Sequence, residues 1–213
     1  LNKKYTELDI VWFKRDLRTL DNKSLEFVSK SGNPTLFVYI FEPSVIDSPD
    51  CDHRHIRFIN ESIIDIEKKL KKFSLDIKCV NCEVIEFFKE ISKTYKIKNV
   101  LSYQEIGNNL SYSRDKKIAQ FFRSKNINWI QSKTNGIIRG LSSRKNWKKK
   151  WIEEMKSEVV VTDLDSINKQ KVKIPSKIKV YNSKHEFDKN FQPGGESYAW
   201  MYIKSFQKSR HIG

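Results

Sequence analysis

The chain has 213 residues, of which 38% are hydrophobic and 31% charged, and its formal net charge is +15. This length and apolar content suffice for one domain with a buried core, and no stretch approaches the roughly 18 apolar residues of a membrane-spanning helix. Three cysteines and no recognisable export signal favour a reducing, cytoplasmic setting.

Short apolar runs alternate along the chain with longer amphipathic segments. The runs are continuous and rich in β-branched and aromatic residues, as buried parallel strands are. They predict strands at residues 8–13, 34–41, 75–80, 99–103 and 127–130. The amphipathic segments place apolar residues three and four positions apart. They predict helices at residues 22–31, 53–72, 83–96 and 111–125, the first capped by Asp21 or Asn22.

This alternation predicts an α/β fold. We expect a five-stranded parallel, doubly wound, Rossmann-like sheet with helices on both faces. In such a sheet, ligands bind at the carboxyl ends of the strands, where the strand order reverses. The polar segments after the first and fourth predicted strands, "KRDLR" and "YQEIGN", both fall at such ends.

The character of the sequence changes after residue 157. The segment "KQKVKIPSKIKV" (169–180) is polar, basic and proline-containing, and it predicts a linker wrapped over a surface. A last helix follows "FQPGGE", with Ala199, Tyr202, Ile203 and Phe206 on its apolar face. Because no later segment of the given sequence could pack on that face, we expect a further domain to be missing. The expected domains are 1–134, the α/β domain; 135–190, its last helix and a linker; and 191–213, the truncated start of a helical domain.

Neither glycine-rich nucleotide loops nor a metal site are expected. The seven glycines form no G-x-G-x-x-G or G-x-x-x-x-G-K-[ST] motif after the first strand. Cys79 and Cys82 form a C-x-x-C at a predicted strand-to-helix junction, but no second pair lies at metal-ligand spacing. Incidental cysteines are favoured over a reactive thiol pair, and no metal ligand is assigned.

The segment "RKNWKKKW" (144–151) interleaves cations with aromatic residues. Such a pattern can contact nucleic acid, since bases stack on aromatic rings and cations meet phosphates. The net charge agrees with a polyanionic partner, although only slightly better than with compositional drift. The alternative, which we favour, is an amphipathic helix whose Trp147, Trp151 and Met155 face the core and whose lysines are solvated.

The segment "KRDLR" (14–18) has two interpretations that the residues alone leave open. Asp16 could orient Arg15 or Arg18, whose planar guanidinium suits a carboxylate or a phosphate. The same charges could instead form an ion pair that only completes the end of a strand.

Four segments, in order, carry a resemblance that covers nearly the whole chain. They are "VWFKRDLRTLDNKSL" (11–25), "YQEIGNNLSYSRDKK" (103–117), "NGIIRGLSSRKNWKKKWIEEM" (135–155) and "FQPGGESYAWMYIKSF" (191–206). The sequence resembles the DNA photolyase/cryptochrome family, and its second segment resembles a bacterial branch of that family.

The resemblance implies the N-terminal antenna-type domain of a deoxyribodipyrimidine photolyase, a light-dependent DNA repair flavoenzyme. In that family, reduced FAD donates an electron to a cyclobutane pyrimidine dimer, and FAD and damaged DNA are held by a C-terminal helical domain. That domain is expected beyond Gly213, so no catalytic residue is assigned here and the chain alone is expected to be an inactive monomer with no membrane contact. The alternatives are the same domain of a cryptochrome photoreceptor and a standalone α/β nucleotide-binding module.

The resemblance also implies a site for an antenna chromophore, a folate or a deazaflavin, in the loops after the first, second and fourth strands. Aromatic rings would contact a flat ring system, cations an acidic tail, and Glu or Asn the ring nitrogens. The expected residues are Lys14, Arg15, Asp16, Arg18, Tyr39, Phe41, Glu42, Glu105, Gly107 and Asn108.

Overall fold

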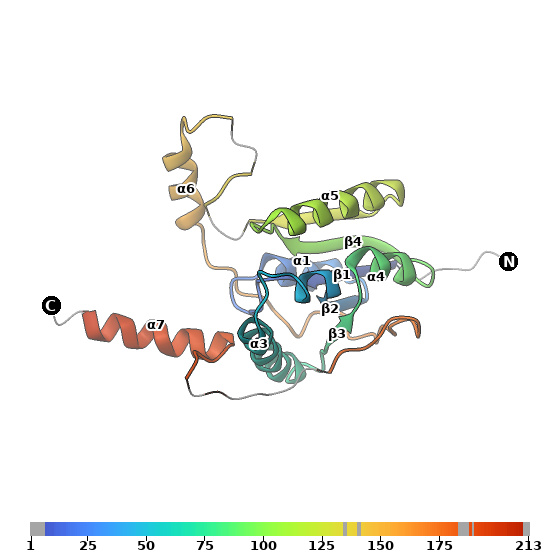
Figure 1. The fold of residues 1–213 in the computed structure, drawn as a ribbon, viewed down its shortest axis with the longest axis horizontal. Coiled ribbons are helices and arrows are strands. Elements are labelled where there is room, and N and C mark those ends of the chain that lie inside the picture. Colours follow the sequence, from blue (N-terminus) through green and yellow to red (C-terminus); the bar gives the residue numbers. More distant parts are fainter. Residues whose placement is uncertain (1–6, 134–135, 140–141, 183–187, 189, 211–213) are drawn as a thin grey trace.

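The computed structural model describes residues 7–133, 136–139, 142–182, 188 and 190–210 (Figure 1). Five strands form one parallel sheet in the order β3-β2-β1-β4-β5. The strands are β1 (Glu7–Phe13), β2 (Thr35–Phe41), β3 (Ile77–Asn81), β4 (Lys96–Tyr103) and β5 (Asn128–Ser132). The predicted sheet is confirmed, and its order reverses between β1 and β4, so the carboxyl ends of these two strands meet at the expected binding position.

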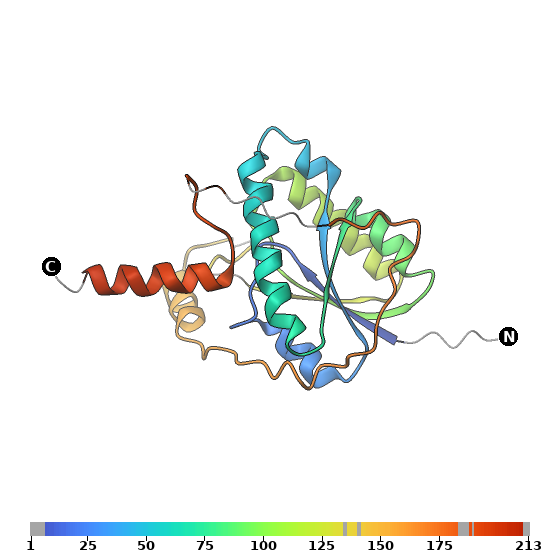
Figure 2. The same ribbon diagram turned by 90° about the horizontal axis from the view of Figure 1, so that it is seen from below.

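Helices cover both faces of the sheet, as predicted (Figures 1 and 2). Buried residues of α1 and α3 pack on one face with Val11 and Phe37, whereas α4 and α5 pack on the other with Ile10 and Val38. The described helices are α1 (Lys23–Ser31), α2 (Pro43–Ile46), α3 (His53–Lys71), α4 (Val84–Ile91), α5 (Asn109–Ser124), α6 (Trp147–Met155) and α7 (Glu196–Arg210).

The structure refines the ends of the predicted helices. Asn22, not Asp21, caps α1, because its side-chain oxygen accepts the backbone N–H groups of Ser24 at 3.0 Å and Leu25 at 3.2 Å. The helix predicted over 83–96 ends at Ile91, since a turn at residues 92–94 leads directly into β4. The short helix α2 was not predicted; it starts with a proline, which suits the first helical position.

The predicted linker lies over the domain, as expected. Val172 and Ile178 are buried against the α4 side of the core. The backbone then joins the edge of β3 at one antiparallel bridge, between Val80 and Val180. The orange segment in Figure 2 follows this path. A strand edge with open hydrogen-bonding groups is thereby covered.

Helix α6 forms where a helix was favoured, but the prediction that its aromatic residues face the core is wrong. Trp147, Trp151 and Met155 are 40%, 41% and 47% exposed. The reason is geometric: α1, α3, α4 and α5 already cover the sheet, and α6 projects from it (Figure 1). The tryptophans instead pack on each other, with ring centroids 6.4 Å apart.

Helix α7 is also confirmed, and it extends away from the sheet (Figure 2). Its predicted apolar face is exposed, with Tyr202, Ile203 and Phe206 between 43% and 54% accessible. The predicted boundary at 134/135 lies outside the described residues. Within the described parts of the chain, no helix is both long enough and apolar enough to cross a membrane.

Candidate functional site

A cleft of about 860 Å³ opens at the carboxyl ends of β1, β2 and β4. Helix α3, the start of α5 and the first turns of α7 complete its walls. It is lined by nine of the ten predicted site residues, Lys14, Arg15, Asp16, Arg18, Tyr39, Phe41, Glu42, Glu105 and Asn108, whereas Gly107 is not among the lining residues. The fold therefore brings together residues that are up to 94 positions apart in the sequence.

Arg114, on the first turns of α5, joins three carboxylates, of which Glu42 and Glu105 line this cleft and Asp115 lies beside it. Its Nη1 lies 2.6 Å from Glu42 Oε1, and its Nη2 lies 2.9 Å from Glu105 Oε2 and 3.0 Å from Asp115 Oδ1. The guanidinium also lies over the Trp12 ring, 5.2 Å from its centroid. Each of the three carboxylate side chains is at most 7% exposed, so Arg114 is their main source of charge compensation.

Lys14 is buried beneath the cleft surface. Its Nζ lies 3.3 Å from Asp115 and 4.2 Å from the centroid of the Trp12 ring. Burial lowers the pKa of Lys14 to about 8, although Asp115 opposes this shift. The Lys14 ammonium group therefore lies in the floor of the cleft and is shielded from solvent.

Arg15 is the most exposed of the four cations that line the cleft, with 72% of its side chain accessible. Its Nε donates to Glu105 Oε1 at 2.7 Å. Burial alone would raise the pKa of Glu105, but Arg114 and Arg15 outweigh burial and lower it. Glu105 is therefore a carboxylate that positions Arg15 at the mouth of the cleft.

The loop after β1 is ordered by its own charged residues, but not as predicted. Asp16 pairs with neither arginine; its Oδ1 accepts the backbone N–H of Lys14 at 3.0 Å. Arg18 donates instead to the carbonyl oxygens of Leu20 and Asp21 at 3.1 and 2.9 Å. The interpretation in which Asp16 orients Arg15 or Arg18, one of the two left open, does not hold, because each guanidinium has closer acceptors elsewhere.

Asp16 retains one unused acceptor. Among the described residues, its Oδ2 has no hydrogen-bond partner, although the side chain is buried and lines the cleft. Burial raises the pKa of Asp16 above its ordinary value. A buried polar atom without a partner is uncommon in a folded protein, and it suits a ligand that offers a complementary polar group.

The second strand contributes an aromatic wall and a carboxyl group. The rings of Tyr39 and Phe41 lie 4.8 Å apart, and Phe41 stacks on Tyr181 at 3.9 Å. Phe41 is only 2% exposed, so Tyr39 offers more of this wall to a ligand. Burial raises the pKa of Glu42 to about 7, although Arg114 lowers it in part.

The titration of Glu42 gives a stability prediction. Because its folded pKa lies above the ordinary value of 4.5, the folded state binds more protons than the unfolded state between pH 4.5 and 7. The contribution of Glu42 to stability is therefore greatest below pH 4.5 and is lost as pH rises to about 7. We expect Glu42→Gln to flatten this part of the stability profile, measured by urea unfolding at pH 5 and pH 7.5. An unchanged slope in the variant would assign the titration to another group.

Gly107 and Asn108 build the start of α5. Asn108 caps the helix by accepting the backbone N–H of Ser111 at 3.2 Å, and its amide donates to Asp50 at 2.9 Å. A Cβ on Gly107 would lie 2.4 Å from the Ser111 hydroxyl oxygen. Both residues thus fix the turn that brings Arg114 to the cleft.

Arg114 and Asp115 were absent from the predicted site. The signal was available: the predicted helix 111–125 turned Ile118 inward, and residues three and four positions before it share that face. The C-x-x-C residues lie outside the site, and burial raises the pKa of Cys82 to about 12, which disfavours a reactive thiolate. Within the described ranges, no cluster of three or more His, Cys, Asp or Glu side chains could hold a metal ion.

Comparisons with known proteins agree with one another. The DNA photolyase family model matches residues 9–150. A deoxyribodipyrimidine photo-lyase from Buchnera aphidicola is 23% identical over an alignment that covers 93% of this chain and 44% of the relative. Cryptochrome DASH from Solanum lycopersicum is 29% identical over 45% of this chain and 18% of the relative.

Two solved structures share the fold. The archaeal photolyase from Sulfolobus tokodaii aligns with a TM-score of 0.55 and 21% identity, over 72% of this chain and 36% of that one. The cryptochrome from Synechocystis sp. PCC6803 aligns with a TM-score of 0.60 and 15% identity, over 76% of this chain and 37% of that one. The chain thus spans less than half the length of each of these proteins and of the two curated relatives.

Proposed function

Because the chain belongs to the DNA photolyase family, we propose that it is the N-terminal antenna-type domain of a light-dependent deoxyribodipyrimidine photolyase. FAD, bound by a helical domain outside the assigned residues of this chain, would supply the light-driven electron transfer that splits a cyclobutane pyrimidine dimer. A lesion of this kind is flipped out of the duplex at low cost, because damage has already weakened its pairing. The observation that carries the proposal is the cleft at the carboxyl ends of β1, β2 and β4.

We propose that this cleft holds a folate or deazaflavin antenna chromophore. Tyr39 would contact the flat ring, Arg15 would contact an acidic tail, and the unused oxygen of Asp16 would bond a ring nitrogen or carbonyl. The volume of about 860 Å³ suits a ligand of that size. The photolyase from Sulfolobus tokodaii was solved with two FAD molecules and with the implication of a novel light-harvesting cofactor, so a flavin is a further ligand to test.

We also propose the domain account that the sequence suggested. Residues 1–134 form the α/β domain, residues 135–190 its last helix and a linker, and residues 191–213 the start of a helical domain that binds FAD and damaged DNA. The exposed apolar face of α7 supports this account, as does the shorter length of the chain relative to its matches. No FAD ligand is assigned in the present chain, which on this account does not repair DNA by itself.

The second candidate is the same domain of a cryptochrome, a blue-light photoreceptor. The similarity to Cryptochrome DASH from Solanum lycopersicum and to the Synechocystis cryptochrome favours it. A longer protein that carries the helical domain would separate the two. Loss of dimer absorbance under near-ultraviolet or blue light supports repair, whereas flavin photoreduction without such loss supports signalling.

The antenna proposal predicts that the purified chain binds a folate or deazaflavin with a red-shifted absorbance. Arg15→Ala should weaken this binding about tenfold, because it removes the most exposed cation of the cleft. Lys30→Ala is the matched control; it removes an exposed cation of α1 that does not line the cleft. The absence of saturable binding at high ligand concentration, or equal affinities for both variants, would count against the antenna site.

A further inference from the structure

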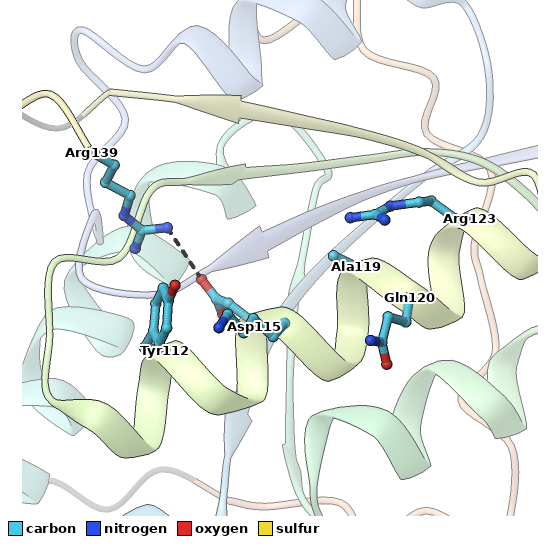
Figure 3. Close-up of a pocket in the computed structure, with 7 residues that line it drawn as sticks. Tyr112, Asp115, Ala119, Gln120, Arg123 and Arg139 are labelled. Carbon is cyan, nitrogen blue, oxygen red and sulfur yellow. Dashed lines mark ion pairs between the residues drawn. The ribbon is translucent and has the colours of Figure 1, made fainter. Parts of the chain in front are cut away.

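A second, smaller hollow lies along α5 (Figure 3). It encloses about 430 Å³ between α5 and the segment that follows β5. Tyr112, Lys116, Ala119 and Arg123 follow one another at steps of four, three and four residues and so share a face of the helix. Arg139 lines the same hollow from outside the helix. We call this hollow the α5 groove.

Positive charge dominates the α5 groove. Three cations line it, and Asp115 is its one lining carboxylate. The Asp115 carboxylate already contacts Arg114 at 3.0 Å and Lys14 at 3.3 Å, and Arg139 reaches it only at 3.8 Å. Among the described residues, no carboxylate forms an ion pair with Lys116 or Arg123. The groove therefore offers guanidinium and ammonium donors that the protein itself leaves largely uncompensated.

The arrangement of the two arginines distinguishes this groove from an ordinary solvated helix face. Figure 3 shows Arg123 and Arg139 at opposite ends of the groove, with the small side chain of Ala119 between them. Because the arginines come from different segments, the fold rather than helical periodicity brings them to one hollow. Guanidinium groups present planar sets of donors that match phosphate oxygens.

The groove also carries an aromatic wall. The Tyr112 side chain stands next to Arg139 in Figure 3 and is 51% exposed as a residue. The Lys116 ammonium lies 4.5 Å from the centroid of its ring. An aromatic ring beside cations favours a ligand that has both a flat ring and an anionic group. The volume is within the range for small-molecule sites.

We propose that the α5 groove binds a small phosphate-bearing ligand with a flat ring, of the size of a nucleoside monophosphate. Arg123 would bind the phosphate at one end of the groove, and Tyr112 and Arg139 would contact the ring at the other end. The proposal concerns residues other than Arg15, Tyr39 and Asp16, so it stands or falls independently of the antenna cleft.

Calorimetric titration of the whole 213-residue chain with adenosine 5′-monophosphate tests this site. We expect saturable binding at one site with a Kd below about 1 mM. Arg123→Gln and Arg139→Gln should each weaken binding about tenfold. Adenosine, which lacks the phosphate, should bind at least about tenfold more weakly than the monophosphate. Circular dichroism of each exposed-residue variant would establish that it is folded.

Lys117→Gln is the matched control, because Lys117 is an exposed cation of α5 that does not line the groove. Its affinity for the monophosphate should stay within about twofold of the unmodified chain. The proposal is overturned by the absence of saturable binding up to about 10 mM. It is equally overturned if Lys117→Gln weakens binding as much as Arg123→Gln, since that result indicates diffuse attraction to a basic surface.

Discussion

Replacing Arg114 with methionine is expected to lower the free energy of unfolding by about 3–5 kcal/mol. Methionine has a similar length but no charge, so the change leaves Glu42, Glu105 and Asp115 buried with much less compensation. Removing one partner of a buried ion pair is costly because the remaining charge cannot regain its hydration. Urea unfolding at neutral pH measures the loss, and Lys117→Met, at an exposed position of the same helix, should change stability by less than about 0.5 kcal/mol.

A compensated variant can distinguish the effect of the lost charge on stability from the effect of the changed side-chain shape. Adding Glu42→Gln and Glu105→Gln to Arg114→Met removes two of the buried carboxylates along with the cation. This triple variant should recover part of the lost stability, since the interactions of residues in one network are not additive. A loss below about 1 kcal/mol in Arg114→Met would contradict the role of Arg114 as the charge centre of the cleft.

Glu61→Gln is expected to have the second largest effect, a loss of about 3 kcal/mol. Glu61 is 6% exposed; its Oε1 lies 2.7 Å from Arg57 Nη1, and its Oε2 accepts the backbone N–H of Gly194 at 2.6 Å. Because both partners are donors, a glutamine must turn its NH₂ group toward one of them. Hydrogen exchange should also show the Gly194 amide opening about tenfold or more faster. Glu67→Gln, at an exposed position of α3, is the control.

This second prediction concerns the attachment of α7. Glu196 accepts the backbone N–H groups of Thr19 and Leu20 at 3.0 and 2.9 Å, and Lys69 lies 2.6 Å from it. A Cβ on Gly194 would lie 2.2 Å from the Phe58 carbonyl oxygen, so the chain approaches α3 closely there. If Glu61→Gln leaves both stability and Gly194 exchange unchanged, these contacts alone hold α7, and Glu61 does not contribute.

The order and type of the main elements followed from the sequence. Short apolar runs such as residues 10–13 are typical of buried strands in a parallel sheet. The three- and four-residue spacing of the isoleucines in α3 is typical of an amphipathic helix. The exposure of α6 could not be predicted from the sequence. The spacing of Trp147 and Trp151 shows that they share one face of a helix, but not whether that face is buried. Which face is buried depends on where the remaining surface of the sheet is free, and α1, α3, α4 and α5 had already occupied it.

The position of the site could be predicted from the sequence, but the ion-pair partners of its charged residues could not. Residues after β1 and β4 meet because parallel strands end at the same edge, which sequence order alone indicates. The partners of each charge did not follow: Arg15 pairs with Glu105, which is 90 residues away, rather than with its neighbour Asp16. From the sequence alone, an ion pair is expected between residues that are neighbours in the chain. In the folded protein, a buried charge pairs instead with the group that the fold places in the best geometry.

The strand order also has a consequence for synthesis. The central strand β1 is made first, yet its partner β4 ends at Tyr103, and Arg114 and Asp115 follow only on α5. During translation β1 must therefore wait, with one side unpaired, until β4 has been made up to residue 103. Pausing or truncation before α5 would leave the carboxyl groups of the cleft without Arg114, and pausing before β4 would leave an open sheet edge, which favours aggregation of a nascent chain.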